Sequence, residues 1–556
     1  MSSTTELHGV GIGQGVASGP VAWMTPAPAA PVDGPASRPA AEELDAVHAA
    51  VSAVAADLTA RSEQVDGPAK DVLEAQAMMA EDPTLDESVT DLVNEGKSGE
   101  WAVHRAFADF AEQLKELGGY LGERAADLAD VAQRVVAHLR GVPAPGVPDP
   151  GHPFVLVAQD LAPADTALLD LTKVLAVVTT EGGPTSHTAI LAADKGIVAV
   201  VGLGDGSALT DGETVVVDAS ASTVTVNPSD EQVAEAESRA EARRAAADAP
   251  LTPGALADGT AVPLLANLGN PDGAEEAVAL GAEGVGLFRT EFLFLSSEEA
   301  PSVESQTESY TKLLSAFPGQ KVVVRMLDAG ADKPLAFLTD EGEENPALGR
   351  RGIRSLRNHE EILDQQLAAL AAADAATEAK LQVMAPMVAT VEETEYFVAK
   401  CREHGIKVAG VMVEVPSVAL QADQVFAKAD FGSIGTNDLT QYTLAADRLL
   451  GSTATYQDPW HPAVLKLIAM IGEAGAKHNK PVGICGQAAA DPLLAVVLVG
   501  LGATSLSMSP KALVDVRAEI KKFTLDQAVQ IAAAAVEQAE AADAKAAARA
   551  LADSFL

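Results

Sequence analysis

The feature that most constrains the fold is a series of short apolar runs in the second half of the chain. From Leu251 onward such runs recur, and segments with helical spacing separate them. Eight runs can be counted, at residues 263–268, 284–294, 321–327, 381–387, 408–416, 431–439, 481–486 and 505–509. Eight strands that alternate with helices over roughly 250 residues or more are the pattern of a (β/α)8 barrel. We therefore predict a TIM-type barrel over residues 251–556.

Polar residues stand near the carboxyl ends of these runs, where barrels of this kind gather their active sites. They are Arg289, Arg325, Glu414, Asn437, Asp438 and Cys485. Arg351, Arg448 and Lys333 lie in the segments that follow two of these runs. The chain has 38 Lys and Arg against 79 Asp and Glu, a net charge of −41. A small anionic substrate would therefore need such a local cluster of cations, although any one of them could also serve a structural ion pair.

The first half of the chain divides at two proline-rich stretches, residues 25–39 and 142–153. Between them proline is scarce and apolar residues recur at helical spacing, whereas both flanks alternate β-like runs with turns. We predict one α/β domain built from residues 1–24 and 142–228, with a helical domain inserted at residues 25–141.

Residues 229–250 have the pattern of a linker helix. Ser229 and Gln232 are spaced as in a capping box, good helix formers follow, and Pro250 and Pro253 end the pattern. The predicted fold class is thus a multidomain α/β protein: an α/β domain with a helical insert, a linker helix and a barrel.

A glycine-rich turn carries a histidine in the α/β domain. The segment Gly-Gly-Pro-Thr-Ser-His, residues 182–187, follows an apolar run and precedes a helix-like stretch. At a helix start, free N–H groups and the helix dipole favour a phosphate on the imidazole of His187. The hydroxyl of Thr185 could fix the tautomer of that ring. Taken alone, the motif is also compatible with a capping Ser186 beside an incidental histidine.

Two carboxylates and a cysteine complete the candidate chemistry on the barrel. Glu414 and Asp438 each end a predicted strand, and a pair of hard oxygen ligands suits Mg²⁺, which keeps waters and takes substrate oxygens. Solvated carboxylates, or carboxylates paired with arginine, are the other reading. Cys485 could be inert packing, as we expect for Cys401.

Bulk properties narrow the cellular context. The excess of acidic over basic residues disfavours nucleic acid and anionic membranes as partners. Two distant cysteines predict a reducing compartment without disulfides. The first residues lack the pattern of a signal peptide, and no apolar run approaches the roughly 20 residues of a membrane span. We expect a cytoplasmic protein.

In combination these motifs resemble Enzyme I of the bacterial sugar phosphotransferase system, the phosphoenolpyruvate–protein phosphotransferases. The resemblance extends over nearly the whole chain. Its most specific segments are residues 182–190, 284–294, 344–354, 413–416, 433–442 and 483–486. It implies an enzyme that moves the phosphoryl group of phosphoenolpyruvate to His187, releases pyruvate, and passes the group on to the phosphocarrier protein HPr.

The same resemblance implies a role for each site residue. Glu414 and Asp438 match the Mg²⁺ ligands, and Cys485 matches the acid that protonates the enolate of pyruvate. The substrate-binding positions are Arg289, Arg325 and Arg351 for the phosphate, with Asn437, Asp438 and Arg448 towards the rest of the molecule. Thr185 and Lys333 are supporting residues.

The family further implies that the helical insert binds HPr and that the protein is a homodimer through its barrel. Four positions depart from the family pattern: Gln76, Ala193, Ala331 and Gln487. They leave the reaction type unchanged and bear on docking and on contacts around the site. Which sugars the pathway serves, and which regulators act on it, the motifs do not specify.

Two other functions compete with this one. Pyruvate phosphate dikinase and phosphoenolpyruvate synthase share the Thr-Ser-His segment and the barrel, but they need a large nucleotide-binding domain ahead of it. Only 184 residues precede Thr185, and no Walker-type glycine loop is present, so ATP dependence is not expected. A non-catalytic scaffold that binds HPr would not need Glu414, Asp438 and Cys485.

Overall fold

The structure is a computed structural model that describes most of the chain. The residues outside the description are 1–3, 14, 64–67, 118–124, 162–168, 184–185, 187, 190–191, 193–194, 249, 296–299, 330–334, 336, 339–342, 344 and 449. The chain divides into two compact units, one made of residues 1–193 with 197–237 and the other of residues 194–196 with 238–556.

The first unit contains an eight-stranded mixed sheet with strand order β1-β8-β7-β3-β4-β5-β6-β2. Its strands are β1 Thr5–His8, β2 Val10–Ile12, β3 Val16–Trp23, β4 Phe154–Ala158, β5 Val174–Thr179, β6 Ala199–Val201, β7 Thr214–Asp218 and β8 Thr223–Val226. The strands β3, β4, β5 and β6 run parallel. All five residues of β4 are apolar and buried, because apolar cores cover both faces of the sheet there.

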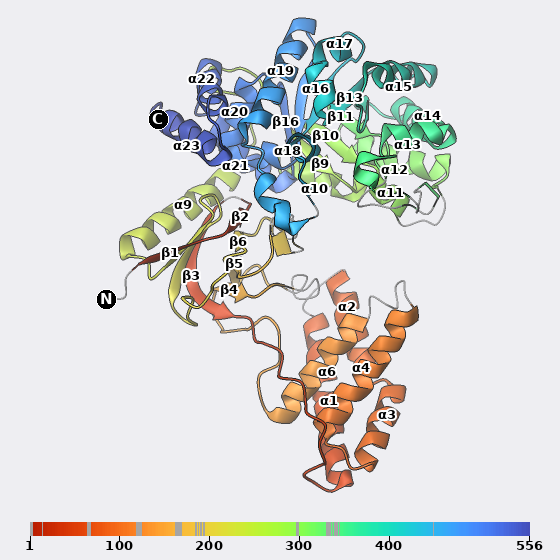
Figure 1. Ribbon diagram of the computed structural model, residues 1–556, viewed down its shortest axis with the longest axis vertical. Coiled ribbons are helices and arrows are strands. Elements are labelled where there is room, and N and C mark those ends of the chain that lie inside the picture. Colours follow the sequence, from red (N-terminus) through yellow and green to blue (C-terminus); the bar gives the residue numbers. More distant parts are fainter. Residues whose placement is uncertain are drawn as a thin grey trace. The chain divides into compact units, whose positions relative to one another are not determined.

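The described helices between β3 and β4 in the sequence enclose an apolar core of their own (Figure 1). They are α1 Ala40–Ser62, α2 Pro68–Ala80, α3 Pro83–Asn94, α4 Gly99–Leu117 and α6 Ala125–Arg140. Asp82 caps α3, since its carboxylate accepts hydrogen bonds from the N–H groups of Thr84 and Leu85. A helical insert between two parts of one sheet agrees with the predicted fold class, whereas the predicted domain boundaries stay predictions.

The linker helix α9 spans Asp230–Asp248. Its predicted capping box is present: the N–H of Ser229 donates to Gln232 Oε1 at 2.9 Å, and the N–H of Gln232 donates to Ser229 Oγ at 3.3 Å. The chain passes from the first unit to the second within this helix, at residues 237 and 238.

Eight parallel strands close into a barrel in the second unit. They are β9 Leu264–Leu268, β10 Gly284–Arg289, β11 Lys321–Arg325, β12 Lys380–Ala385, β13 Ala409–Val413, β14 Gly432–Gly435, β15 Val482–Cys485 and β16 Ser505–Met508. Each predicted run overlaps one strand, so the predicted barrel is confirmed. Two runs were drawn too long, because residues 291–295 and 436–444 are helical, and apolar composition alone does not separate short helices from strands.

Helices surround the barrel (Figure 1). They are α10 Ala274–Ala279, α11 Glu291–Leu295, α12 Val303–Ser315, α13 Ile353–Asn358, α14 Glu360–Ala376, α15 Val391–Glu403, α16 Pro416–Leu420, α17 Ala422–Phe426, α18 Thr436–Leu444, α19 Pro462–His478, α20 Pro492–Gly500, α21 Leu513–Ile520, α22 Leu525–Val536 and α23 Ala541–Asp553. The alanine-rich α22 and α23 pack on α20 and on each other. None of the described helices combines the length and apolar character that a membrane crossing needs.

Candidate active site

The carboxyl ends of the barrel strands carry the predicted polar residues. Arg289 ends β10, Arg325 ends β11 and Cys485 ends β15, while Glu414 follows β13 directly. Asn437 and Asp438 lie in the first turn of α18, which starts where β14 stops. Because all eight strands are parallel, these positions belong to one rim of the barrel.

Arg325 is buried between two carboxylates. Its Nη2 lies 2.9 Å from Glu291 Oε1 and its Nη1 lies 3.0 Å from Asp328 Oδ2. Burial by itself lowers the pKa of Arg325, but the charges of Glu291 and Asp328 outweigh burial and raise the pKa. The Nε of Arg325 is buried without a hydrogen-bond partner among the described residues. One donor of this guanidinium is therefore available to a ligand.

Arg351 joins Asp328 to Asp438. Its Nε and Nη2 donate to the two oxygens of Asp328 at 3.0 Å each, and its Nη1 and Nη2 donate to the two oxygens of Asp438 at 2.9 and 3.0 Å. Nη1 also donates to the hydroxyl of Tyr442 at 3.2 Å. All five N–H groups of the guanidinium are thus used. Arg351 can contact a phosphate only if it releases one of these partners.

Arg289 is the contrasting member of the cluster. It is mostly buried, yet it makes no hydrogen bond or ion pair with any described residue. Burial and the neighbouring charge of Arg325 lower the pKa of Arg289. A desolvated cation whose donors are unused among the described residues, beside a second arginine with an unused Nε–H, has the chemistry that an anion requires.

Glu414 is a buried carboxyl with little positive charge to balance it. Its Oε1 accepts from the N–H of Met387 at 2.7 Å. Met387 follows β12 with a φ of 56°, an uncommon conformation for a residue with a side chain, and this conformation aims its N–H at Glu414. Burial, followed by the charges of Asp438 and Asp328, raises the pKa of Glu414 to about 8.

A glycine makes room for this carboxyl. A Cβ on Gly435, the last residue of β14, would lie 2.5 Å from Glu414 Oε2. Asp438, three residues later, is also buried, and its Oδ2 lies 3.7 Å from Nη1 of Arg448. Within the described part of the chain, no three His, Cys, Asp or Glu side chains gather in a way that could hold a metal ion alone. Glu414 and Asp438 would need oxygens from substrate or water to complete a metal site.

Cys485 is a buried thiol below this rim. Ser433 Oγ donates to its Sγ at 3.5 Å, and the Sγ donates to the carbonyl of Ile434 at 3.4 Å. Burial raises the pKa of Cys485 to about 11, so the group is a thiol at neutral pH and has a proton to give. Cys401 is also buried, but it lies on α15 and belongs to the core between helices and barrel.

The loop after β15 aligns Asn437. Its side-chain oxygen accepts from the N–H of Gln487 at 3.3 Å, and Thr436 Oγ1 donates to the carbonyl of Cys485 at 3.2 Å. Gly486 has a φ of 113°, and a Cβ there would lie 2.6 Å from Thr436 Oγ1. Gln487, a departure from the family pattern, therefore contributes its backbone N–H to the site.

The predicted phosphate-accepting segment follows β5 in the first unit. Gly182 has a φ of 90°, which allows the turn there. The N–H of Ala189 donates to Ser186 Oγ at 3.2 Å, and Thr188 Oγ1 donates to Asp160 Oδ1 at 2.8 Å. These contacts support the segment on both sides of the predicted histidine. Five positions singled out in the sequence lie outside the described residues: His187, Thr185, Lys333, Ala193 and Ala331.

Three residues of the cluster were not predicted: Glu291, Asp328 and Tyr442. Glu291 and Asp328 follow Arg289 and Arg325 by two and three residues, so they carried the same signal, a polar residue just after a strand. Tyr442 stands one helical turn after Asp438 in α18. The sequence offered no reason to pair these acids with Arg325 and Arg351 rather than with solvent.

Family models match most of the chain. The PEP-binding domain of PEP-utilising enzymes matches residues 243–525, the N-terminal domain of these enzymes residues 8–124, and their mobile domain residues 150–222. The first model alone covers half of the chain, and it contains the whole cluster of charged residues on the barrel.

Curated relatives agree with the family models. A phosphoenolpyruvate-protein phosphotransferase of Streptomyces coelicolor is 52% identical over 98% of this chain and 99% of its own length. Proteins of the same name from Haloferax volcanii and Geobacillus stearothermophilus are 41% and 38% identical, over 81% and 83% of this chain and 81% and 82% of theirs. The chain therefore belongs to the family of phosphoenolpyruvate–protein phosphotransferases, the Enzyme I proteins, and is an enzyme of that family.

Proposed function

We propose that this enzyme transfers the phosphoryl group of phosphoenolpyruvate to its own His187, with Mg²⁺, and then to HPr, as the first step of a sugar phosphotransferase system. Membership of the family supplies phosphoenolpyruvate-dependent phosphotransfer. The observation that supports the rest is the arginine pair at the barrel rim: Arg289, which has no partner among the described residues, beside the unused Nε–H of Arg325.

Phosphoenolpyruvate presents a phosphate and a carboxylate, and both are bound best by arginine. Arg289 and Arg325 have donors to offer at once. Arg351 would join them by exchanging one oxygen of Asp438 for one of the substrate, since all its N–H groups are in use. Asn437 and Arg448, on the Asp438 side, would contact the rest of the substrate.

The donor set of the site suits Mg²⁺. Glu414 and Asp438 are hard oxygen ligands, and Mg²⁺ typically takes one or two carboxylates together with substrate oxygens and water. The raised pKa of Glu414 indicates a buried carboxyl short of positive charge, which a divalent cation would supply. When bound, the ion would neutralise charge on the phosphoryl oxygens. The arginines and the carboxylates of this chain would orient the substrate.

The reaction then needs a nucleophile and an acid. His187 Nε2 attacks phosphorus, the bond between phosphorus and the bridging oxygen breaks, and its electrons remain on the enolate. The enolate carbon takes the proton of Cys485, which forms the methyl group of pyruvate and leaves a thiolate. A thiol with a pKa of about 11 holds its proton until a strong base such as an enolate takes it.

The acceptor and the substrate site belong to different units of the chain. Residue 187 is part of the first unit and the barrel is part of the second. The proposed transfer requires the two to approach, and α9, within which the chain changes unit, is the proposed hinge region. A homodimer through the barrel is a further proposal, based on the family alone.

HPr is the proposed acceptor of the second transfer, and α2 and α6 of the helical insert are its proposed docking elements. In this chain Gln76 occupies the family's histidine position. Its side chain is buried, and its Nε2 donates to Asp127 Oδ1 at 3.3 Å, which ties α2 to α6. Met78 on α2 is 76% exposed and offers an apolar contact to a partner. The acidic chain favours a basic partner face.

The test is incubation with phosphoenolpyruvate labelled in its phosphate, with Mg²⁺ and without nucleotide, followed by mapping of the labelled peptide. We expect acid-labile label on His187, none in His187→Ala, and transfer of the label to added HPr. Label that required ATP would refute the proposal. Label on His187 that did not pass to HPr would refute only the second step.

A further inference from the structure

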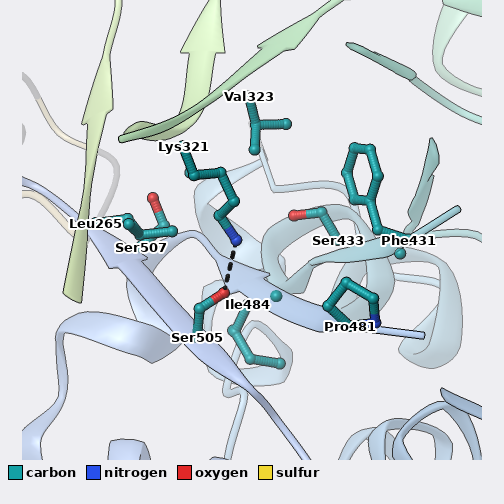
Figure 2. A pocket seen from close by; sticks show the side chains of 12 residues that line it. Leu265, Lys321, Val323, Phe431, Ser433, Pro481, Ile484, Ser505 and Ser507 are labelled. Carbon is teal, nitrogen blue, oxygen red and sulfur yellow. Dashed lines mark hydrogen bonds between the residues drawn. The ribbon is translucent and has the colours of Figure 1, made fainter. Parts of the chain in front are cut away.

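The barrel contains a small cavity, lined by both polar and apolar side chains, that no part of the proposed reaction uses. Lys321, Ser433, Ser505 and Ser507 line it together with apolar residues such as Val323 and Phe431 (Figure 2). Lys321 and Ser505 are the first residues of β11 and β16, and Ser433 is the second residue of β14. The cavity therefore lies near the strand starts, on the opposite side of Cys485 from the substrate rim.

Lys321 is a cation held inside the barrel. It occupies the same face of β11 as Arg325, because side chains alternate along a strand. Its Nζ donates to Ser505 Oγ at 3.2 Å, and among the described residues no carboxylate pairs with it. Burial lowers the pKa of Lys321 to about 8, so the ammonium gives up a proton readily near neutral pH. The residue remains partly exposed and can regain a proton from solvent.

Ser433 connects this cavity to the thiol. Its hydroxyl donates to Cys485 Sγ at 3.5 Å, and its oxygen is turned toward the space that holds the Lys321 amine (Figure 2). Gly483 leaves the intervening space open: a Cβ there would lie 3.3 Å from Ser505 Oγ and 3.8 Å from Ser433 Oγ. The cavity has room for a water molecule, and its four polar side chains would serve that water as hydrogen-bond partners.

We propose that Lys321, a cavity water and Ser433 form a relay that returns a proton to Cys485 after each turnover. This inference rests on the proposed role of Cys485 as the acid. The thiolate takes the hydroxyl proton of Ser433, whose oxygen takes a proton from the water. The water takes one from the Lys321 ammonium, which becomes a neutral amine and is reprotonated by solvent at the strand starts. Ser505 holds the amine in place, and no proton is gained or lost in sum.

The experiment follows a deuteron through the reverse reaction. Enzyme that is turning over phosphoenolpyruvate is given pyruvate carrying deuterium on its methyl group. The thiolate that the forward reaction leaves on Cys485 then takes a deuteron when the reverse reaction forms the enolate. In the wild type the relay exchanges that deuteron with water before the forward reaction returns it. Recovered pyruvate should therefore lose deuterium at each exchange of phosphoryl groups between phosphoenolpyruvate and pyruvate.

Lys321→Met should lower the ratio of deuterium loss to phosphoryl exchange by at least about tenfold. Its first turnover should remain normal, because Cys485 starts protonated, whereas steady-state turnover with HPr should fall. Lys321→Arg keeps a cation that does not release its proton, and Ser433→Ala removes the middle of the relay, so both should lower the ratio too. Either variant decides the question if Lys321→Met does not fold. If Lys321 had only a structural role, its substitution would slow deuterium loss and phosphoryl exchange equally.

Ser507→Ala is the matched control. Ser507 lines the same cavity, but its hydroxyl donates to Asn267 Oδ1 at 2.5 Å and it lies outside the relay, so the ratio should not change. Cys485→Ala separates the two possible failures. If Cys485→Ala leaves deuterium loss and turnover unchanged, Cys485 is not the acid, and the relay proposal is refuted as well. If it abolishes deuterium loss while Lys321→Met and Ser433→Ala retain the wild-type ratio, only the relay is refuted.

Discussion

Asp328 is the residue whose removal should disturb the rim most, although it was not among the residues predicted from the sequence. Its Oδ2 lies 3.0 Å from Arg325 Nη1, and its two oxygens accept from Arg351 at 3.0 Å each. Its side chain is 3% exposed, so water cannot replace these contacts. Asp328→Asn keeps the shape of the side chain and removes its charge from between two buried cations.

The expected loss in the free energy of unfolding depends on the ion-pair partners that each arginine retains. Removal of one partner of a buried ion pair typically costs about 3–5 kcal/mol, because the other charge is left uncompensated. Here Arg325 retains Glu291 at 2.9 Å, and Arg351 retains Asp438 at 2.9 and 3.0 Å. We therefore expect the lower end, a loss of about 3 kcal/mol in the free energy of unfolding of the barrel.

Tryptophan fluorescence in urea can measure the barrel alone. The chain has three tryptophans, and Trp460 is the one in the barrel, where it is 3% exposed. With Trp23→Phe and Trp101→Phe as background, the transition reports only the barrel, which allows a linear extrapolation. Asp364→Asn is the matched control: Asp364 also contacts two basic side chains, Lys400 and His404, but it is 39% exposed.

The control should cost less than about 1 kcal/mol, because solvent screens exposed pairs. Asp328→Asn should also lower kcat/KM for phosphoenolpyruvate, since Arg351 loses the carboxylate that orients it. Equal stability losses in the two variants would contradict the reasoning, because they would mean that burial of the rim pairs adds nothing to their cost. An unchanged kcat/KM would mean that Arg351 does not take part in substrate binding.

Three further predictions concern single residues. Arg289→Met should raise the KM for phosphoenolpyruvate by about 100-fold or more. The thermal midpoint should stay unchanged or rise, because folding lowers the pKa of Arg289 and its positive charge therefore opposes folding at neutral pH. A lower midpoint would mean that Arg289 has a structural partner. Cys485→Ala should lower kcat by about 10²–10⁴-fold, with little change in substrate affinity measured by titration. The control Cys401→Ala should keep full turnover. Equal effects of the two substitutions on kcat would exclude Cys485 as the acid. Gly435→Ala should displace the Glu414 carboxyl and lower the free energy of unfolding in urea by about 1–3 kcal/mol. It should also raise the Mg²⁺ concentration needed for half-maximal activity. An unchanged Mg²⁺ requirement would argue against Glu414 as a ligand.

Much of the architecture could be read from the chain because it rests on local rules. Apolar runs of strand length with helical segments between them specify a barrel, and the alternation repeats eight times from residue 251 onward. The same holds for α9, whose cap at Ser229 and Gln232 is formed by neighbours in sequence. The candidate residues at strand ends also followed, because parallel strands of one barrel bring their carboxyl ends to one rim.

The sequence by itself thus determined the fold class, the family and which candidate residues stand at the carboxyl ends of the barrel strands. Only the tertiary structure decided how their charges are shared: Arg351 uses all its donors on Asp328, Asp438 and Tyr442, whereas Arg289 has none engaged among the described residues. It also placed Lys321 and Ser433 around one cavity. Such pairings join residues that are not neighbours in the sequence, 23 positions apart for Arg351 and Asp328 and 87 for Arg351 and Asp438. They depend on distance and burial, which no local pattern encodes.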